Sequence, residues 1–254
     1  MQSFKTYIKR SLGKGSHIEW GEIDLEIGTD FDLEPLIDEE IEIFEFEIRR
    51  KGVHVLAWYI SPLDDFQAGG IHFSVKGMRY FARWIFAKIN DFCTKNLKNL
   101  EPLEAECMKR QILKLAFSIL LNHEQCHYAI DKSMTGIDFK NIEIRQMYNE
   151  IKRNLDIKID ESICNANVLT KRKPNVEIRK LDCKKAIEDI IKEFMDMQPR
   201  DYGFFRDFLP KSKFHSKSTS TLKSIFNPIK INNEEFKNSL LAKQRKNISF
   251  YFDD

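Results

Sequence analysis

Two histidines and a glutamate lie close together near the middle of the chain. His123, Glu124 and His127 fit the pattern H-E-x-x-H. Histidines four positions apart lie on one face of a helix, one turn from each other, so both imidazoles can reach a single tetrahedral zinc ion. Glu124 lies about 100° around the helix, where its carboxylate can take a proton from water that the metal activates. The pattern predicts a hydrolytic zinc site with Glu124 as general base.

The sequence that precedes the motif is strongly apolar. The run ILKLAFSILL leads almost directly into His123, so the motif is expected on a buried helix. Buried imidazole and carboxylate groups are costly unless they have partners, which favours a bound metal. An accidental motif in a metal-free protein and a purely structural histidine pair are the alternatives. Equimolar zinc in the purified protein would exclude both alternatives.

A catalytic zinc site of this kind needs a third protein ligand and an open coordination position. The later segment DESICNAN, which reads as helical, offers Glu161. Asn165 lies one turn later on the same face and is expected to accept a hydrogen bond from the ring N–H of a ligand histidine. Asp160 and Glu143 are rival third ligands, although Asp160 faces elsewhere if the helix has already begun.

These residues resemble the zincin metallopeptidases, and specifically their glutamate-ligand branch, the gluzincins. The resemblance implies that His123, His127 and Glu161 bind Zn²⁺ and that Glu124 is the general base of peptide-bond hydrolysis. Gluzincins usually carry Asp four residues after the third ligand, where this chain has Asn165. An amide accepts the same hydrogen bond without adding charge. The size and the strand-rich beginning are also similar to phage-exclusion peptidases of bacteria.

Two cysteines offer a different kind of site. Cys126 and Cys164 could lie near the metal, and a thiolate ligand would close its coordination sphere. The protein would then be a non-catalytic, zinc-stabilised interaction module. A role as small buried hydrophobes is simpler for both.

A zincin also needs a donor that stabilises the oxyanion of the tetrahedral intermediate. No local pattern identifies this donor. The candidates are Tyr128, His72, Tyr202 and His215.

The elements that must position the motif begin with strand-like patterns, from about residue 17 to 76. HIEWGEIDLEIG and EEIEIFEFEIRR alternate apolar and charged side chains, as strands with one buried face do. VHVLAWYI reads as a more central strand, and IHFSV as a short one. By the resemblance, GGIHFSV would be the edge strand beside the cleft, pairing with an extended peptide substrate. His17 and His54 fall in strand patterns and are expected to be structural.

From about residue 77 the apolar period becomes helical. GMRYFARWIFAKINDFCTKNL predicts one helix, and the segment that contains the motif predicts a long one through the middle of the domain. IEIRQMYNEIKRN, DESICNANVLTKRK and LDCKKAIEDIIKEFMDM predict further helices. The predicted fold class is therefore α+β, with an N-terminal antiparallel sheet packed on a helical core that carries the motif.

The expected organisation is a single domain over residues 1–200. Its strand-rich part covers 1–76 and its helical part 77–200, and residues 201–254 are expected to be a C-terminal loop and tail packed on it. FHSKSTSTLKS reads as an exposed loop because Ser, Thr and Lys dominate it. NISFYFDD reads as a late strand or a docked tail.

Composition argues against several classes of function. Of the 254 residues, 42% are hydrophobic and 31% charged, as in ordinary globular proteins. The net charge of +2 predicts neither nucleic-acid nor membrane binding, and the basic segment 211–223 reads as a solvated loop. Five cysteines without a CxxC pair, no secretory leader and no long apolar run predict a reduced, cytoplasmic protein. The expected partner is a protein or peptide substrate, and the oligomeric state stays open.

Overall fold

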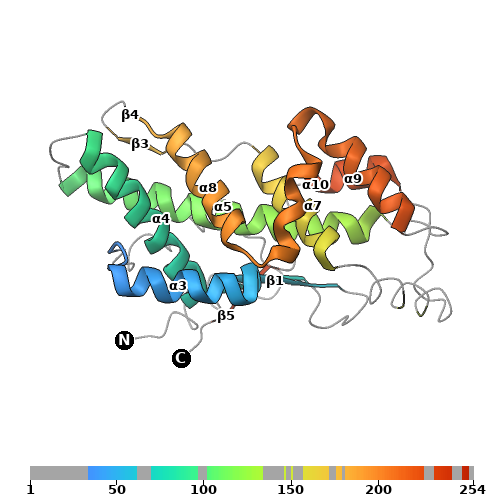
Figure 1. Cartoon of the computed structure of the whole chain (residues 1–254), viewed down its shortest axis with the longest axis horizontal. Coiled ribbons are helices and arrows are strands. Elements are labelled where there is room, and N and C mark those ends of the chain that lie inside the picture. Colours follow the sequence, from blue (N-terminus) through green and yellow to red (C-terminus); the bar gives the residue numbers. More distant parts are fainter. Residues whose placement is uncertain are drawn as a thin grey trace, which may run out of the picture.

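The computed structural model of the chain describes a mostly helical α+β molecule (Figure 1). The residues that it describes are 34–61, 70–96, 102–133, 146, 150, 157–171, 176–178, 181–225, 232–241 and 248–251. HIEWGEIDLEIG, His17 and Glu143, and almost all of IEIRQMYNEIKRN, lie outside them. No helix in the described part is long and apolar enough to cross a membrane.

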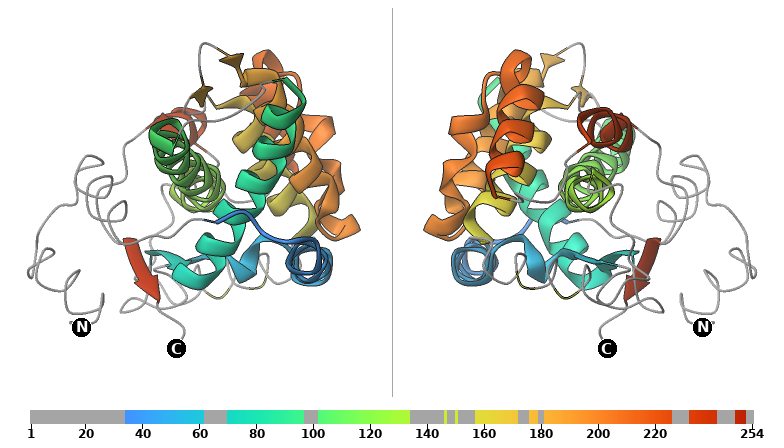
Figure 2. Two further views of the ribbon diagram at one scale, coloured as in Figure 1. Left: turned by 90° about the vertical axis from the view of Figure 1, so that its left-hand side faces the viewer. Right: turned by 90° about the vertical axis from the view of Figure 1, so that its right-hand side faces the viewer.

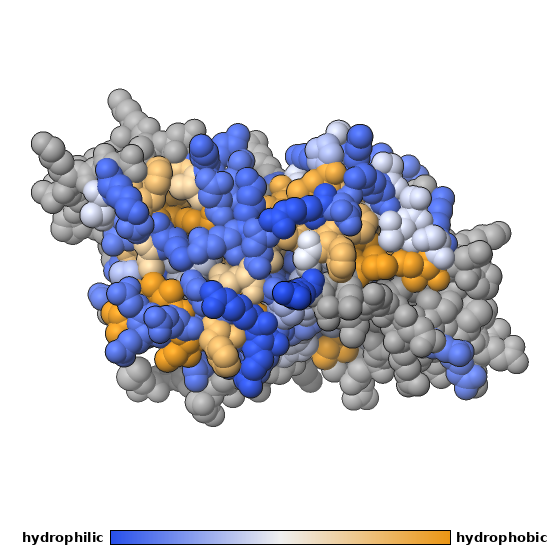
Figure 3. All heavy atoms as spheres, in the orientation of Figure 1, coloured by the Kyte–Doolittle hydropathy of each residue, from blue (hydrophilic) through white to orange (hydrophobic). Residues whose placement is uncertain are grey.

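The first described element is a helix, α3 (Asp38–Lys51), where the alternating pattern predicts a strand. That prediction is wrong. The acidic first turn and the basic last turn both complement the helix dipole. The buried residues Phe44 and Ile48 are four apart, as a helix requires, whereas Ile43 and Phe46 are 65% and 61% exposed. Figure 3 shows this apolar surface among the charged side chains of α3. The alternation therefore divides the apolar side chains between two sides of a helix.

A 3-10 turn, η1 (Gly52–Val55), joins α3 to the sheet. Strand β1 (Ala57–Ile60) covers only the second half of the predicted strand VHVLAWYI. Gly52 ends α3 with a φ of +69°, a conformation that favours glycine.

The sheet has the order β1-β2-β5. Strand β2 (Gly70–Ser74) is antiparallel to β1 and parallel to β5 (Ile248–Tyr251). IHFSV is therefore a strand, and the late strand in NISFYFDD is confirmed. The prediction that GGIHFSV forms the edge is wrong, because β2 is the middle strand and is buried along its whole length. The described edge nearest the histidines is β1.

Two long helices form the centre of the molecule; the sequence predicts both helices, and it predicts the central place for the motif helix. Helix α4 (Val75–Asn96) begins where the Gly77 N–H donates to Ser74 Oγ at 2.9 Å. Helix α5 (Pro102–Ser133) runs along the longest axis of the molecule (Figure 1). Phe81 and Trp84 of α4 pack on Phe194 of α8 (Lys184–Met197), with ring centroids 4.4 and 6.1 Å apart. This aromatic core fixes the helical layer that supports α5.

Helix α7 (Ile157–Thr170) carries the predicted third ligand and packs on α5. The Asn167 side chain donates to the Asn122 carbonyl at 2.7 Å, which ties the two helices together. Short strands β3 (Glu177–Ile178) and β4 (Leu181–Asp182) follow, and then α8. The 3-10 helix η2 (Arg200–Phe208) covers the other side of α7.

The segment FHSKSTSTLKS is part of helix α9 (Lys211–Ile225), so the loop prediction is wrong. Phe214, Ser218 and Leu222 recur every four residues and are all buried, which is a helical face in which a serine replaces an apolar residue. Helix α10 (Asn233–Leu241) follows, and Asn232 caps its first turn. Figure 2 shows α10 lying against α5. Residues after 200 thus contribute packed helices to the core.

Candidate metal site

Helix α5 brings the two motif histidines together. His123 and His127 are one turn apart, and both are buried. Their Nε2 atoms lie 3.3 Å from each other. Both rings therefore direct the same nitrogen to one point.

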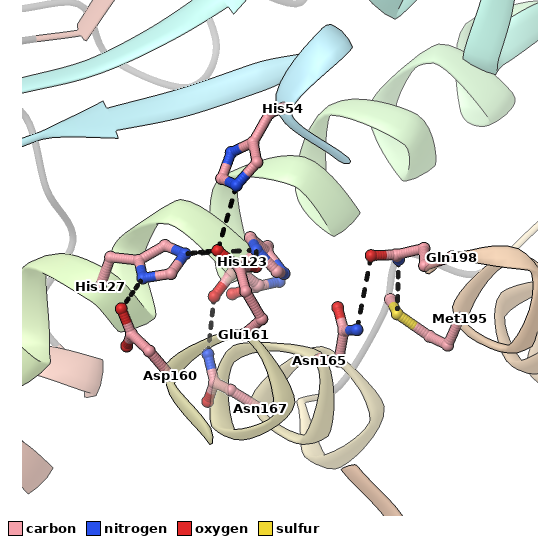
Figure 4. Close-up of polar contacts among 10 residues, drawn as sticks. His54, His123, His127, Asp160, Glu161, Asn165, Asn167, Met195 and Gln198 are labelled. Atoms are coloured by element: carbon pink, nitrogen blue, oxygen red, sulfur yellow. Dashed lines mark hydrogen bonds and ion pairs between the residues drawn. The ribbon is translucent and has the colours of Figure 1, made fainter. Parts of the chain in front are cut away.

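Helix α7 adds the Glu161 carboxylate at that point (Figure 4). Its Oε2 lies 3.0 Å from His123 Nε2, and its Oε1 lies 3.5 Å from His127 Nε2. Zinc bonds of about 2.0–2.1 Å at tetrahedral angles separate neighbouring ligand atoms by about 3.3–3.4 Å. The separations of His123 Nε2 from His127 Nε2 and from Glu161 Oε2 lie close to that value, and one donor atom from each of the three side chains lies within 4.8 Å of the other two, so one Zn²⁺ fits between them. Glu161 is only 3% exposed, so a partner is required.

The charges of the cluster are strongly coupled. Burial raises the pKa of Glu161, but His127 and His123 outweigh burial and hold this pKa far below its usual range. Burial likewise lowers the pKa of His127, but Asp160 and Glu161 outweigh it and raise this pKa well above the usual value. In the absence of a metal, a proton on His127 therefore stabilises the carboxylates. A cation in the cluster would take the place of that positive charge.

Glu124 is fully buried beside the cluster. Neither of its carboxylate oxygens has a hydrogen-bond partner among the described residues. Burial raises the pKa of Glu124 despite the neighbouring histidines. A buried carboxylate without a partner is costly, and a raised pKa suits a group that must accept and then return a proton.

The ring of His127 is held by Asp160. Its Nδ1 lies 3.0 Å from Asp160 Oδ2. The sequence suggested Asp160 as a rival ligand of the metal, but its contact with the far nitrogen of the ring makes it the residue that orients His127.

Asn165 does not make the hydrogen bond predicted for it. Its Nδ2 lies 3.5 Å from Gln198 Oε1, and its Oδ1 has no partner among the described residues. The Nδ1 atom of His123 has none there either. Figure 4 shows Asn165 directed toward Gln198, away from the histidine cluster. The prediction for Asn165 is therefore wrong. Asn165 lies one turn after Glu161 on α7, but its amide contacts Gln198, just before η2, instead of an imidazole.

His54 belongs to the cluster, although its sequence pattern suggested only a structural role. Its Nε2 lies 3.2 Å from Glu161 Oε1, and its side chain is 45% exposed. The hydrogen bond to Glu161 is the main cause of its raised pKa, in opposition to burial. No local signal identifies His54, because it is a single histidine on a short turn far from the motif in sequence.

The two cysteines near the motif are both buried, and their thiols contact each other. Donor atoms of Cys164, His127 and Asp160 lie within 4.8 Å of one another, as do those of His123, His127 and Glu161. Two donor sets thus share His127. Cys126 belongs to neither set.

The side chains considered as oxyanion donors are distributed over the molecule. Tyr202 packs edge-on against His54, with ring centroids 6.2 Å apart. Tyr128 packs against Tyr59, which itself stacks on His127 at 6.5 Å. His72 stacks on Trp58, and His215 packs between Phe214 and Phe236. Tyr202 therefore contacts a residue of the cluster, and Tyr128 is connected to the cluster through Tyr59.

Comparison with known proteins gives no relative: the chain matches no protein-family model, no curated protein and no solved structure. The functional argument consequently depends on the geometry of the site.

Proposed function

We propose that this protein is a zinc-dependent hydrolase that cleaves peptide bonds. The observation that carries the proposal is the convergence of His123 Nε2, His127 Nε2 and the Glu161 carboxylate beside the buried Glu124. Two nitrogens and one carboxylate oxygen are a donor set that zinc accepts, and a set of three leaves one position open. The resemblance of these residues to gluzincins supports the same assignment.

In the proposed reaction, bound zinc supplies Lewis acidity, which polarises a carbonyl oxygen and makes water more acidic. Glu124 accepts the proton of the attacking water and returns it to the leaving amine. Its position next to both ligand histidines suits this task, and so does the absence of a hydrogen-bond partner for it among the described residues. Asp160 keeps the His127 ring in place during these steps.

A peptide substrate is favoured by the strand next to the histidines. No described strand pairs with the outer edge of β1, and Tyr59 of β1 stacks on the His127 ring. An extended peptide that added to this edge would pass along the cluster. We assign to β1 the substrate-pairing role that the sequence suggested for GGIHFSV.

None of the five cysteines, all of which the structure describes, forms a disulfide, as expected for a protein of a reducing compartment. We therefore propose a cytoplasmic protein or peptide as the substrate.

Glu124→Gln provides the test of this function. Purified wild type should contain one equivalent of zinc and cleave members of a mixed peptide library, detected by mass spectrometry. The Glu124→Gln variant should keep the zinc and lose cleavage, because an amide accepts no proton at neutral pH. Cleavage undiminished in this variant, or a wild type without zinc, would contradict the proposal.

The donor set with Cys164 favours a second candidate, a zinc-stabilised interaction module without catalysis. Its zinc would bind Cys164, His127 and Asp160. X-ray absorption separates the two candidates, since a zinc–sulfur distance of about 2.3 Å occurs only in the second.

A further inference from the structure

The two oxygens of the Glu161 carboxylate have different neighbours. Oε2 lies 3.0 Å from His123 Nε2, whereas Oε1 lies 3.2 Å from His54 Nε2 and 3.5 Å from His127 Nε2. His54 enters from η1, on the side of the carboxylate away from α7 (Figure 4). Because its side chain is 45% exposed while Glu161 is buried, His54 lies on the solvent side of the cluster.

A glutamate can bind zinc through one oxygen or through both. Chelation through both oxygens adds a second donor from the same residue, and with two histidines it fills a four-coordinate sphere. Binding through one oxygen keeps a position for water or substrate, which catalysis requires. What occupies the second oxygen therefore decides whether the site is open.

We propose that His54 is a positioning residue that holds Glu161 Oε1 by a hydrogen bond, so that only Oε2 is presented to the metal. This inference rests on the proposed zinc site and adds to it the group that keeps the coordination sphere open. A hydrogen bond to a carboxylate is stronger than one between neutral groups, so Oε1 is well occupied. His54 acts through Glu161 and needs no contact with substrate.

The turn that carries His54 is built to place it. Two glycines flank it in space: a Cβ on Gly52 would lie 3.0 Å from the Tyr202 ring, and one on Gly77 would lie 2.5 Å from the Val55 carbonyl oxygen. Their lack of a side chain lets Tyr202 and the start of α4 approach η1 closely. Tyr202 then packs edge-on against the His54 ring. The His54 ring is thus supported by an aromatic neighbour as well as by its contact with Glu161.

The test compares crystal structures of the zinc-loaded wild type, His54→Leu and His54→Gln. In the wild type, Glu161 Oε2 should lie about 2.0–2.2 Å from zinc, with Oε1 clearly farther away and still bonded to His54. His54→Leu should bring both oxygens into the coordination sphere. His54→Gln, whose amide N–H can reach Oε1, should restore the single-oxygen mode. His215→Gln, a histidine that packs between Phe214 and Phe236, is the matched control and should resemble the wild type.

Zinc affinity and turnover provide a second measurement. His54→Leu should keep bound zinc but lower turnover by roughly 10–100-fold, the usual effect of a lost neighbour of a metal ligand. A wild type whose Glu161 chelates zinc with both oxygens would overturn the inference even if no variant folds. Single-oxygen binding that persists in His54→Leu would overturn it as well. A wild type that binds no zinc would instead refute the proposed function.

Discussion

At the residue scale, Glu124 is the side chain where stability and the proposed chemistry conflict. It is buried, its pKa is raised mainly by burial, and no described residue bonds its oxygens. A carboxyl group whose pKa rises on folding destabilises the native state at a pH above its unfolded pKa of about 4.3. The cost is tolerated if the group is needed for proton transfer.

Glu124→Gln should therefore stabilise the metal-free protein at pH 7. The amide removes a buried charge, and the expected gain in the free energy of unfolding is about 1–3 kcal/mol. Urea unfolding in the presence of a chelator measures it. The gain should vanish near pH 4, where the wild-type carboxyl is already protonated. Glu42→Gln, at an exposed position, is the control and should change little; equal effects in the two variants would contradict the interpretation.

The electrostatic coupling between His127 and Glu161 makes the effect of zinc on stability depend on pH. In the metal-free protein the raised pKa of His127 contributes stability that is full below about pH 6.5 and is lost as the pH rises through its folded pKa. The lowered pKa of Glu161 contributes stability that is present above about pH 4.5 and is lost at lower pH. Without metal, the ion pair is therefore strongest between about pH 4.5 and 6.5.

Zinc requires a deprotonated His127, so protons compete with it. The increase in melting temperature caused by excess zinc, relative to chelator, should be larger at pH 8 than at pH 6. Thermal unfolding followed by circular dichroism at both pH values tests this expectation. His123→Ala should show little increase at either pH. An increment in the wild type that does not change with pH would argue against His127 as a ligand.

At the element scale, α3 shows how one pattern supports two structures. In a strand, Phe44, Phe46 and Ile48 would share a face, whereas in the helix Phe46 points to solvent. Salt bridges from Glu45 to Arg49 and from Glu47 to Lys51, each four residues apart, favour the helix. The sequence alone does not distinguish a strand from a helix here, because the charged residues could lie on the solvent-exposed side of either one.

Alanine substitutions separate the helix from the strand. Phe44→Ala should cost about 3–5 kcal/mol in the free energy of unfolding, because it leaves a cavity beside Phe81 and Trp84. Phe46→Ala should cost less than about 0.5 kcal/mol, as exposed positions usually do. Guanidinium titrations of both variants give the comparison. Similar losses for the two phenylalanines would indicate that this segment is a strand.

At the scale of the whole molecule, local patterns predicted most of the elements but not their neighbours. The long apolar periods of α4, α5 and α8 specify helices by themselves. The place of β2 in the sheet depends on its pairing with β5, near the other end of the chain, and no local pattern encodes that contact. Helix α9 was missed because its buried face includes Ser218, whose type predicts exposure.

The candidate site divides in the same way. The roles of His123, Glu124 and His127 follow from their spacing within one helix. The role of Glu161 was predicted from a later helix and from the resemblance to gluzincins. His54 could not be predicted, because only the packing of η1 brings it to Glu161. The packing of α7 on α5, not the helix period, decides that Asp160 and not Asn165 meets an imidazole.

The whole-molecule consequence of the site is that zinc would link α5 to α7. A ligand that binds only the native state raises the free energy of every opening reaction that releases it. Zinc should therefore slow amide hydrogen exchange in α5 around His123 and His127 and also in α7 around Glu161. Helix α9, which contributes no ligand, should respond less. Mass spectrometry of the exchanged protein, with zinc and with chelator, measures each helix separately.

Glu161→Ala makes this prediction specific. The two histidines of α5 would still bind zinc weakly, so at saturating zinc the protection of α5 should partly remain while that of α7 disappears. The zinc-dependent protection of α7 is lost because no metal bond then opposes its local opening. Helix α7 still keeps its packing and the Asn167–Asn122 hydrogen bond. If α7 in the variant were protected by zinc as in the wild type, another residue of α7, such as Cys164 of the second donor set, would be the ligand.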